Sequence, residues 1–278
     1  MKLALGIAIA LASLVACEGQ EVYGRSKTAI KYTGRSMPLT RETNCVLWLT
    51  YEYNDGTNFY DYSRNGYDGV ITVATNAPIY STAGEGCVWF DGSGDTIPLP
   101  LGVSFAAPCT LSFWVALTND IGRQLFGVSK QAAATSNRFH IALGEGASST
   151  IVNELVTVAL ITNMAVGVDA KVLCYSNAAA RSWLMNGAWH NLVLVSSGTA
   201  WTFYLDGTNQ TLVAVQGSNT GFYGPISFVN SAQIGSLAYN GNNFGPFLGT
   251  NDEAIIFNRA LSAQEVTNLY VREKGWHP

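Results

Sequence analysis

Apolar residues recur along most of this chain in short runs that are separated by turn-forming dipeptides. Residues 200–207 (AWTFYLDG) are the clearest case, because Trp201, Phe203 and Leu205 alternate with more polar residues. This period of two predicts a strand with one face in the core, and the Asp-Gly and Asn-Gly pairs predict tight turns. Many short strands with regular turn signals are typical of an antiparallel sandwich or barrel. The predicted strands cover residues 46–53, 69–74, 87–92, 110–117, 138–144, 154–163, 171–176, 190–197, 200–207, 210–217, 232–237 and 252–258.

One helix is predicted near the end of the chain. Ser262 is a suitable N-cap, and Glu265 three residues later completes a capping box. Leu261 and Val266 have the spacing of a hydrophobic staple across the helix start. We expect the helix to run through about Tyr270 and to pack its apolar face against the sandwich.

The charge content narrows the function classes. Charged residues make up 12% of the chain, about half the share in an average soluble domain, and the net charge is −4. Apolar residues make up 48%, which excludes a disordered chain, and the acidic balance argues against a nucleic-acid partner. Residues 44–278 hold 9 Lys and Arg against 16 Asp and Glu, a net of −7. A surface built mostly from uncharged polar residues favours neutral partners, such as glycans or copies of the same domain.

The N-terminal segment predicts export. Residues 1–16 combine a basic start with a short apolar run, and Leu14-Val15-Ala16-Cys17 resembles the lipobox of bacterial lipoproteins. We therefore expect residues 1–16 to be a signal peptide, Cys17 a lipidation site, residues 17–43 a tether and residues 44–278 one domain. This places the protein at the outer membrane or cell surface through a lipid anchor, or outside the cell. An ordinary signal peptidase site at Ala10-Leu11-Ala12, or a buried helix, is the alternative.

Four cysteines remain if Cys17 carries lipid. An even number in an exported chain predicts disulfides, and four cysteines allow three pairings. Because each cysteine lies in or near an apolar run, we favour Cys45–Cys87 and Cys109–Cys174.

Several strings, in order, resemble the LamG-like jelly-roll family of the concanavalin A-like lectin/glucanase superfamily. They are LWLTYEY with YDYSRNGYDGV, VWFDGSGDTIPLP, TLSFWV, WHNLVLVSSGTAWTFYLDG, IGSL and FLGTNDEAIIFNRALSAQEVTNLY. The resemblance implies an all-β, two-sheet antiparallel jelly-roll sandwich with one short C-terminal helix. Asn251 departs from it, because an aliphatic residue is usual there, and residues 124–185 are divergent. Function follows only weakly from this fold, which hosts lectins, adhesins and hydrolases.

A catalytic site is not predicted. Glucanases of this superfamily carry E-x-D-x-x-E on one strand, and this chain has no such string. Asp252 and Glu253 are adjacent, so on a regular strand they face opposite ways. The histidines His140, His190 and His277 form no Ser-His-Asp pattern in the sequence. We expect a protein that is not an enzyme, with a glycan-active enzyme of unfamiliar site as the third alternative.

A structural Ca²⁺ site is a further expectation from the resemblance, because Ca²⁺ binds hard oxygen ligands. The candidate ligands are Asp61, Asp252 and Asp95, with Asp91 as an alternative to Asp95. The other interpretation is that these aspartates cap turns through their own backbone.

Exposed aromatic and amide residues predict a glycan surface. Aromatic faces stack on the C–H faces of sugar rings, and amide groups bind hydroxyls. Local packing of each residue is the alternative. The candidates are Trp183, Phe222, Tyr223, Tyr239, Asn240, Asn242 and Asn243.

These patterns together predict a non-catalytic recognition module for carbohydrate or protein at the cell surface. The alternative is a structural subunit of a surface appendage, coat or virion that packs against copies of itself. A glycan array and a size measurement separate the two.

Overall fold

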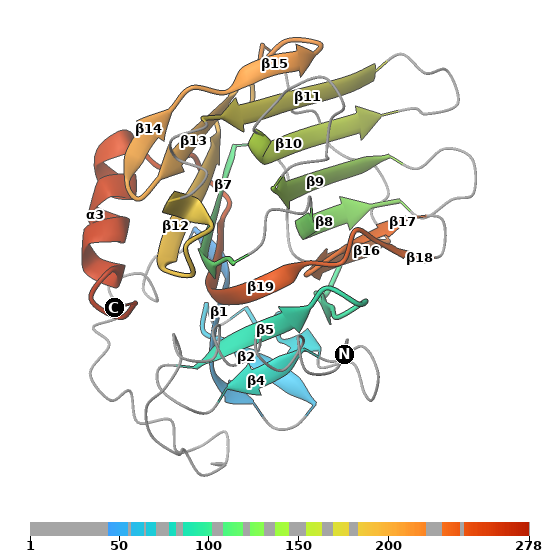
Figure 1. The fold of residues 1–278 in the computed structure, drawn as a ribbon, viewed down its shortest axis with the longest axis vertical. Helices are drawn as coiled ribbons and strands as arrows, with labels where there is room; N and C mark the ends of the chain where they lie inside the picture. The colour runs from blue at the N-terminus through green and yellow to red at the C-terminus, as the bar shows by residue number, and fades with distance from the viewer. Residues whose placement is uncertain are drawn as a thin grey trace.

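The computed structural model contains a two-sheet sandwich (Figure 1). Predictions for residues 1–43, including Cys17, and for Phe222, Tyr223 and Asn240 lie outside the described residues. Those described residues are 44–54, 57–63, 65–70, 78–81, 86–101, 108–118, 123–130, 137–144, 154–162, 169–177, 183–220, 230–239 and 242–277.

The larger sheet has ten strands in the order β14-β13-β12-β7-β19-β1-β2-β3, and β5 lies beside β19 with β4 beyond it. All of its ladders are antiparallel. Its strands are β1 (Cys45–Asn54), β2 (Asn58–Asp61), β3 (Gly69–Val70), β4 (Ile79–Ser81), β5 (Cys87–Asp91), β7 (Cys109–Ala116), β12 (Trp189–Ser196), β13 (Trp201–Leu205), β14 (Thr208–Gln210) and β19 (Leu248–Phe257).

The smaller sheet has seven antiparallel strands in the order β15-β11-β10-β9-β8-β16-β6. A separate hairpin, β17 (Leu237–Tyr239) and β18 (Asn242–Phe244), follows β16 in the chain. The seven strands are β6 (Ile97–Pro98), β8 (Arg123–Ser129), β9 (Arg138–Leu143), β10 (Glu154–Thr162), β11 (Asp169–Ser176), β15 (Val213–Gln216) and β16 (Ser231–Ile234).

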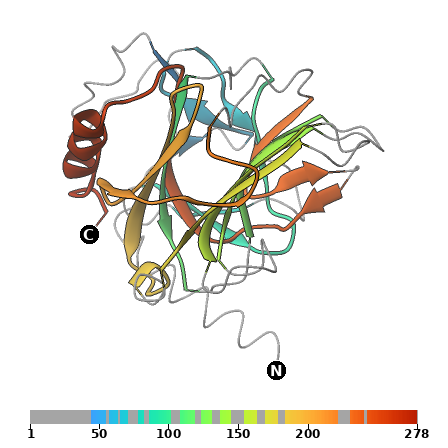
Figure 2. The same cartoon turned by 90° about the horizontal axis from the view of Figure 1, so that it is seen from above.

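The core lies between the two sheets, which face each other in Figure 2. The alternation in β13 has the predicted result, because Trp201 and Phe203 point into this core while Tyr204 packs on the other face. The Trp201 ring stacks on Phe139 of β9, with centroids 5.1 Å apart and planes 13° apart. Burying one such aromatic side chain contributes about 2–3 kcal/mol to folding.

The helix α3 (Ala263–Glu273) lies outside the larger sheet (Figure 2). Its capping box forms as predicted, with Ser262 Oγ accepting from the Glu265 N–H and the Glu265 carboxylate accepting from the Ser262 N–H. The helix runs three residues beyond the expected Tyr270, since Glu273 is drawn into a buried network described below. The all-β sandwich with one short C-terminal helix is therefore confirmed.

The chain folds back on itself at Gly235, within the run 232–237 that was predicted as one strand. Gly235 has φ 90°, and a Cβ there would lie 2.2 Å from the Phe90 ring. Only glycine fits this position, so the run is divided into β16 and β17. No helix among the described residues is long and apolar enough to cross a membrane.

The favoured disulfides are not formed, because Cys45, Cys109 and Cys174 carry thiols. Cys45 pairs with Phe257 on β19. Val88, next to Cys87, pairs instead with Asn251, six residues away along that strand. At roughly 3.3 Å per residue, this separation exceeds the ~7 Å limit between bridged Cα atoms.

The second expected pair fails because its cysteines face different ways. Cys109 lies in the core between the sheets, where burial raises the pKa of its thiol to about 12. Cys174 lies on β11 between Leu173 and Tyr175, which both point into that core. Its Sγ therefore points away from the core, 3.5 Å from Thr157 Oγ1 on β10.

Candidate functional site

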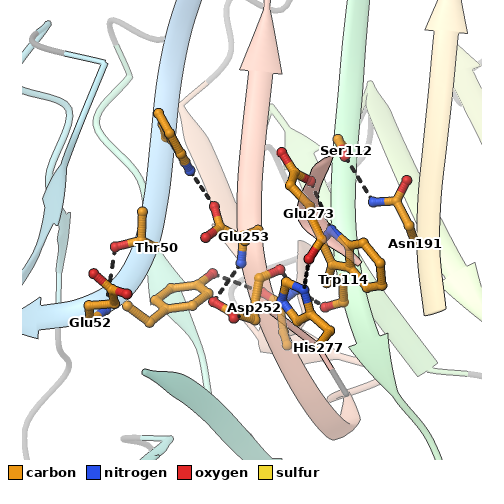
Figure 3. Close-up of polar contacts among 12 residues, drawn as sticks. Thr50, Glu52, Ser112, Trp114, Asn191, Asp252, Glu253, Glu273 and His277 are labelled. Carbon is orange, nitrogen blue, oxygen red and sulfur yellow. Dashed lines mark hydrogen bonds and ion pairs between the residues drawn. The ribbon is translucent and has the colours of Figure 1, made fainter. Parts of the chain in front are cut away.

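The two adjacent acidic residues of β19 belong to a buried polar network (Figure 3). Asp252 Oδ1 accepts from the Glu253 N–H at 2.7 Å, and its Oδ2 lies 2.9 Å from Nε2 of His277. Glu253 accepts a hydrogen bond from the Trp48 indole. Glu253 has φ 48°, and the ladder with β7 is irregular between Asp252 and Ile255. This bulge lets both carboxylates be satisfied inside the protein.

Glu273, at the end of α3, is the third buried carboxylate of the network. It accepts from the Trp114 indole at 2.8 Å and pairs with Arg272 at 2.9 Å, and burial raises the pKa of its carboxyl group. The His277 ring stacks on Trp114, with centroids 4.1 Å apart. His277 Nδ1 faces the Glu273 backbone carbonyl at 3.1 Å and Nε2 faces Asp252, so only the imidazolium form donates to both acceptors.

Asn251, where the resemblance to the family calls for an aliphatic residue, belongs to the same network. The Tyr51 hydroxyl donates to Asn251 Oδ1 at 2.8 Å, and Asn251 Nδ2 donates to the Trp114 carbonyl at 2.9 Å. Burial raises the pKa of Tyr51, with further contributions from Asp252 and Glu253, so its hydroxyl remains a donor. The network thus joins β1, β7, β19 and the C-terminal segment, and its carboxylates are buried inside the protein.

The three predicted calcium ligands have separate hydrogen-bond partners. Asp61 accepts from the backbone of Trp48, Ser63 and Tyr67 and so organises a turn. Asp95 accepts from the Asp91 N–H at 2.8 Å, and burial raises the pKa of its carboxyl group to about 6.

Within the described ranges, no three His, Cys, Asp or Glu side chains form a group that could hold a metal ion. Asp61, Asp95 and Asp252 are therefore not brought together among these residues. Calcium binding stays a prediction, which melting with and without a chelator checks.

Trp183 lies in a helical segment shortly before β12, and 42% of its surface is exposed. Its ring centroid is 4.0 Å from that of His190, whose Nε2 donates to the Trp183 carbonyl at 3.0 Å. His190 Nδ1 lies 3.0 Å from Asp206 Oδ2. Both imidazole nitrogens thus face acceptors, so this Asp–His pair supports this segment and is not arranged to activate a nucleophile.

The hairpin β17–β18 carries the second group of predicted residues. Asn242 and Asn243 are exposed, and Phe244 beside them has 57% of its surface exposed. We call these three residues the hairpin surface. Sequence reasoning missed Phe244, although an aromatic residue directly after two asparagines in GNNFG was the available signal.

Specific contacts pack the β17–β18 hairpin against the smaller sheet. Ser129 of β8 donates to the Ala238 carbonyl. Gly127 of β8 allows a close approach, because a Cβ there would lie 2.8 Å from Leu237 Cα. These contacts hold the hairpin against the smaller sheet.

Further hydrogen bonds fix the side chain of Asn243 in the hairpin surface. Gln233 of β16 donates to Asn243 Oδ1 at 3.2 Å, and Asn243 Nδ2 donates to the Gly94 carbonyl at 3.4 Å.

The structure does not join all the predicted ligand residues into one site. Asn242 and Asn243 lie on the hairpin beside the smaller sheet, whereas Trp183 packs on His190 of the larger sheet. Tyr239 lies at the end of β17.

A family profile described as Laminin_G_3, the concanavalin A-like lectin/glucanases superfamily, matches residues 91–267. The chain belongs to this superfamily. The matched region runs from the end of β5 into α3, so it includes the smaller sheet, the hairpin surface, β7, β12, β13, β14 and β19 of the larger sheet, and Trp114, Asn251, Asp252 and Glu253 of the buried network.

Solved structures similar to this superfamily member are mainly binding domains. The binding domain of Paraclostridial Mosquitocidal Protein 1 shares 16% identity, with TM-score 0.55, over 82% of this chain and 52% of that one. The receptor binding domain of botulinum neurotoxin D shares 14%, with TM-score 0.55 and the same coverage. This chain thus spans about half the length of these two structures.

A third structure matches over nearly its whole length. It is domain 4 of AbnA, a GH43 extracellular arabinanase from Geobacillus stearothermophilus, in complex with arabinotriose. It shares 16% identity, with TM-score 0.54, over 82% of this chain and 98% of that one. At these identities the similarities show the fold alone. No curated protein matches this chain in sequence.

Proposed function

We propose that this protein is a non-catalytic recognition module that binds neutral oligosaccharides through the hairpin surface. The observation that carries the proposal is the exposed group of Asn242, Asn243 and Phe244, which contacts on β8 and β16 hold against the sheet. An aromatic face can cover the apolar side of a sugar ring while neighbouring amides bind its hydroxyls.

The charge distribution favours a neutral ligand. Residues 207–251, which include the whole hairpin, contain no Asp, Glu, Lys, Arg or His. Acidic or phosphorylated sugars would find no cationic partner within this segment. Hydrogen bonding and stacking are the interactions that it offers.

The comparisons support the same ligand class. The arabinanase domain that matches over 98% of its length was solved in complex with arabinotriose, a neutral oligosaccharide. The two toxin domains are named as binding and receptor-binding domains, which supports a partner at a cell surface. Neutral oligosaccharides are therefore the first ligands to test.

The non-catalytic part of the proposal rests on the buried network. Asp252, Glu253 and Glu273 are each at most 1% exposed, and each has hydrogen-bond partners within the protein. Glycoside hydrolysis needs two carboxyl groups that flank the bond to be cleaved. Buried and hydrogen-bonded inside the protein, these three side chains do not present such a pair, which supports a non-catalytic role.

We further propose that the module is exported and anchored. Residues 1–16 act as the signal peptide, Cys17 receives lipid, and residues 17–43 connect it to the domain. Mass spectrometry of the mature N-terminus tests this, because an acylated Cys17 supports the anchor and a retained Met1 contradicts it.

An array of neutral oligosaccharides, followed by calorimetry with the best ligand, tests recognition. We expect Phe244→Ala to weaken binding about tenfold, because it removes the stacking ring. Leu101→Ala is the matched control, because Leu101 is 53% exposed and lies outside the hairpin surface. Binding that is unchanged in Phe244→Ala, or equally weakened in both variants, would contradict the site.

A structural subunit is the second candidate function. An uncharged sheet edge, distinct from the hairpin surface, favours it.

A further inference from the structure

One side of the sandwich ends in two consecutive edge strands. β14 is the last strand of the larger sheet and β15 the last strand of the smaller sheet. Only residues 211–212 lie between them in the chain, so both sheets end close together (Figure 1). We call residues 208–216 the edge face.

The edge face is uncharged, and it mixes apolar residues with Thr, Asn and Gln. The residues of β15 are exposed or half-buried, and Val213 has 53% of its surface exposed. Within the described strands, β15 pairs with β11 on one side, through Cys174↔Val213 and Leu173↔Ala214. Among the residues that the structure describes, no strand pairs with its other side, which leaves backbone N–H and C=O groups for another strand.

Soluble proteins usually protect such edges with charged residues, proline or very short strands. The opposite edges of this sandwich follow that rule, since β3 and β6 have two residues each and β6 contains Pro98. The edge face lacks two of these protections, because residues 207–251 contain no charged side chain and 208–216 no proline. Its strands, of three and four residues, are also longer than β3 and β6. An edge without such protection is suited to pairing with another strand.

We propose that the edge face is a self-association surface, where β15 pairs antiparallel with β15 of a second copy around a twofold axis. A neutral strand suits its own copy, because like charges do not meet across the axis. The same contact brings both β14 strands close to the axis, so both sheets contribute to one interface. Val213 becomes buried in the pair, which removes the exposed apolar side chain from water.

The edge face is separate from the hairpin surface, so self-association and oligosaccharide binding can be tested independently. A monomer that still binds oligosaccharide would leave the proposed function intact while contradicting self-association. A dimer that binds no oligosaccharide would have the opposite meaning.

Analytical ultracentrifugation of the full chain over a range of concentrations tests the proposal, in a non-ionic detergent that keeps the N-terminal apolar segment dispersed. We expect a reversible dimer. In Val213→Lys, each copy carries a new ammonium group into the interface, where burying an unpaired charge is unfavourable, and we expect the dissociation constant to rise about tenfold or more.

The matched control is Val271→Lys, because Val271 is 54% exposed but lies on α3. We expect this variant to dimerise like the parent. If Val213→Lys melts at a lower temperature than the control, Gln216→Lys at the other end of β15 provides the same test with a polar parent residue. A chain that is monomeric throughout, a dimer that persists in both β15 variants, or equal effects at positions 213 and 271 would overturn the proposal.

Discussion

The carboxylate of Asp252 lies 2.9 Å from Nε2 of His277, and both side chains are almost completely buried. The pair links β19, at the centre of the larger sheet, to a residue 25 positions later in the chain. The C-terminal segment is thus an integral part of the sandwich. It closes the buried network and stacks on Trp114.

Removing the His277 imidazole should destabilise the folded protein. We expect His277→Ala to lower the free energy of unfolding by about 3 kcal/mol or more, because Asp252 remains buried without its partner. Urea unfolding followed by tryptophan fluorescence measures this. Lys274→Ala is the control, because Lys274 is exposed and should change stability by less than about 0.5 kcal/mol. Equal effects of the two substitutions would contradict the buried pair.

Restoring the usual aliphatic residue at Asn251 should also destabilise this protein. Asn251→Leu leaves the Tyr51 hydroxyl and the Trp114 carbonyl buried without the partners they have now, at a cost of about 2 kcal/mol. Adding Tyr51→Phe removes one of the two groups, so the double variant should be more stable than Asn251→Leu alone. A double-mutant cycle by urea unfolding checks the coupling, and strictly additive effects would contradict it.

The capping box gives a local prediction. Ser262→Ala removes the hydroxyl that accepts from the Glu265 N–H, and we expect a loss of about 1 kcal/mol. Gln264→Ala is the control, because Gln264 is exposed in the same first turn. Thermal unfolding measures both variants. A loss in the control as large as that in Ser262→Ala would argue against the cap.

Acid sensitivity should arise at His140. Burial, with a smaller effect of Arg138, lowers the pKa of His140 from 6.5 to about 3. Below pH 6.5 the unfolded chain binds a proton that the folded chain refuses, so stability falls as the pH decreases toward 3. The full contribution of this group is present above pH 6.5.

Urea midpoints at several pH values test this, with His140→Gln as the variant whose midpoint should depend less on pH in that window. Asp95 has the opposite effect on stability. Its pKa is raised from 3.8 to about 6 in the folded protein, so its contribution to the free energy of unfolding decreases as the pH rises through this range. The difference between parent and variant isolates His140. A pH profile that is identical in both proteins would contradict the prediction.

The strands and the helix could be predicted from the sequence because their signals are local. The alternation in residues 200–207 places Trp201 in the core, and the Ser262–Glu265 pair fixes the start of α3. Gly235 shows the limit of such signals. Its apolar run has the pattern of one strand, and the Phe90 ring, which leaves no room for a side chain at Gly235, comes from a distant part of the chain.

The cysteine pairs and the calcium ligands required knowledge of distances that no local pattern contains. Cys109 and Cys174 both lie in apolar runs, yet they point to different sides of the sheets. Asp61 and Asp95 each accept hydrogen bonds from a nearby backbone N–H, which is the alternative considered from the sequence.

The sequence by itself determined the sandwich, the terminal helix and a neutral surface, since periodicity, capping and composition act within a few residues. Tertiary structure alone decided which polar residues are hidden and which are presented. Asp252 is a candidate calcium ligand in the sequence, and packing of α3 and β19 buries it together with Glu253 and His277. Asn242 is a candidate ligand residue in the sequence and Phe244 is not, but the tertiary structure exposes both on the hairpin that packs beside Gly127.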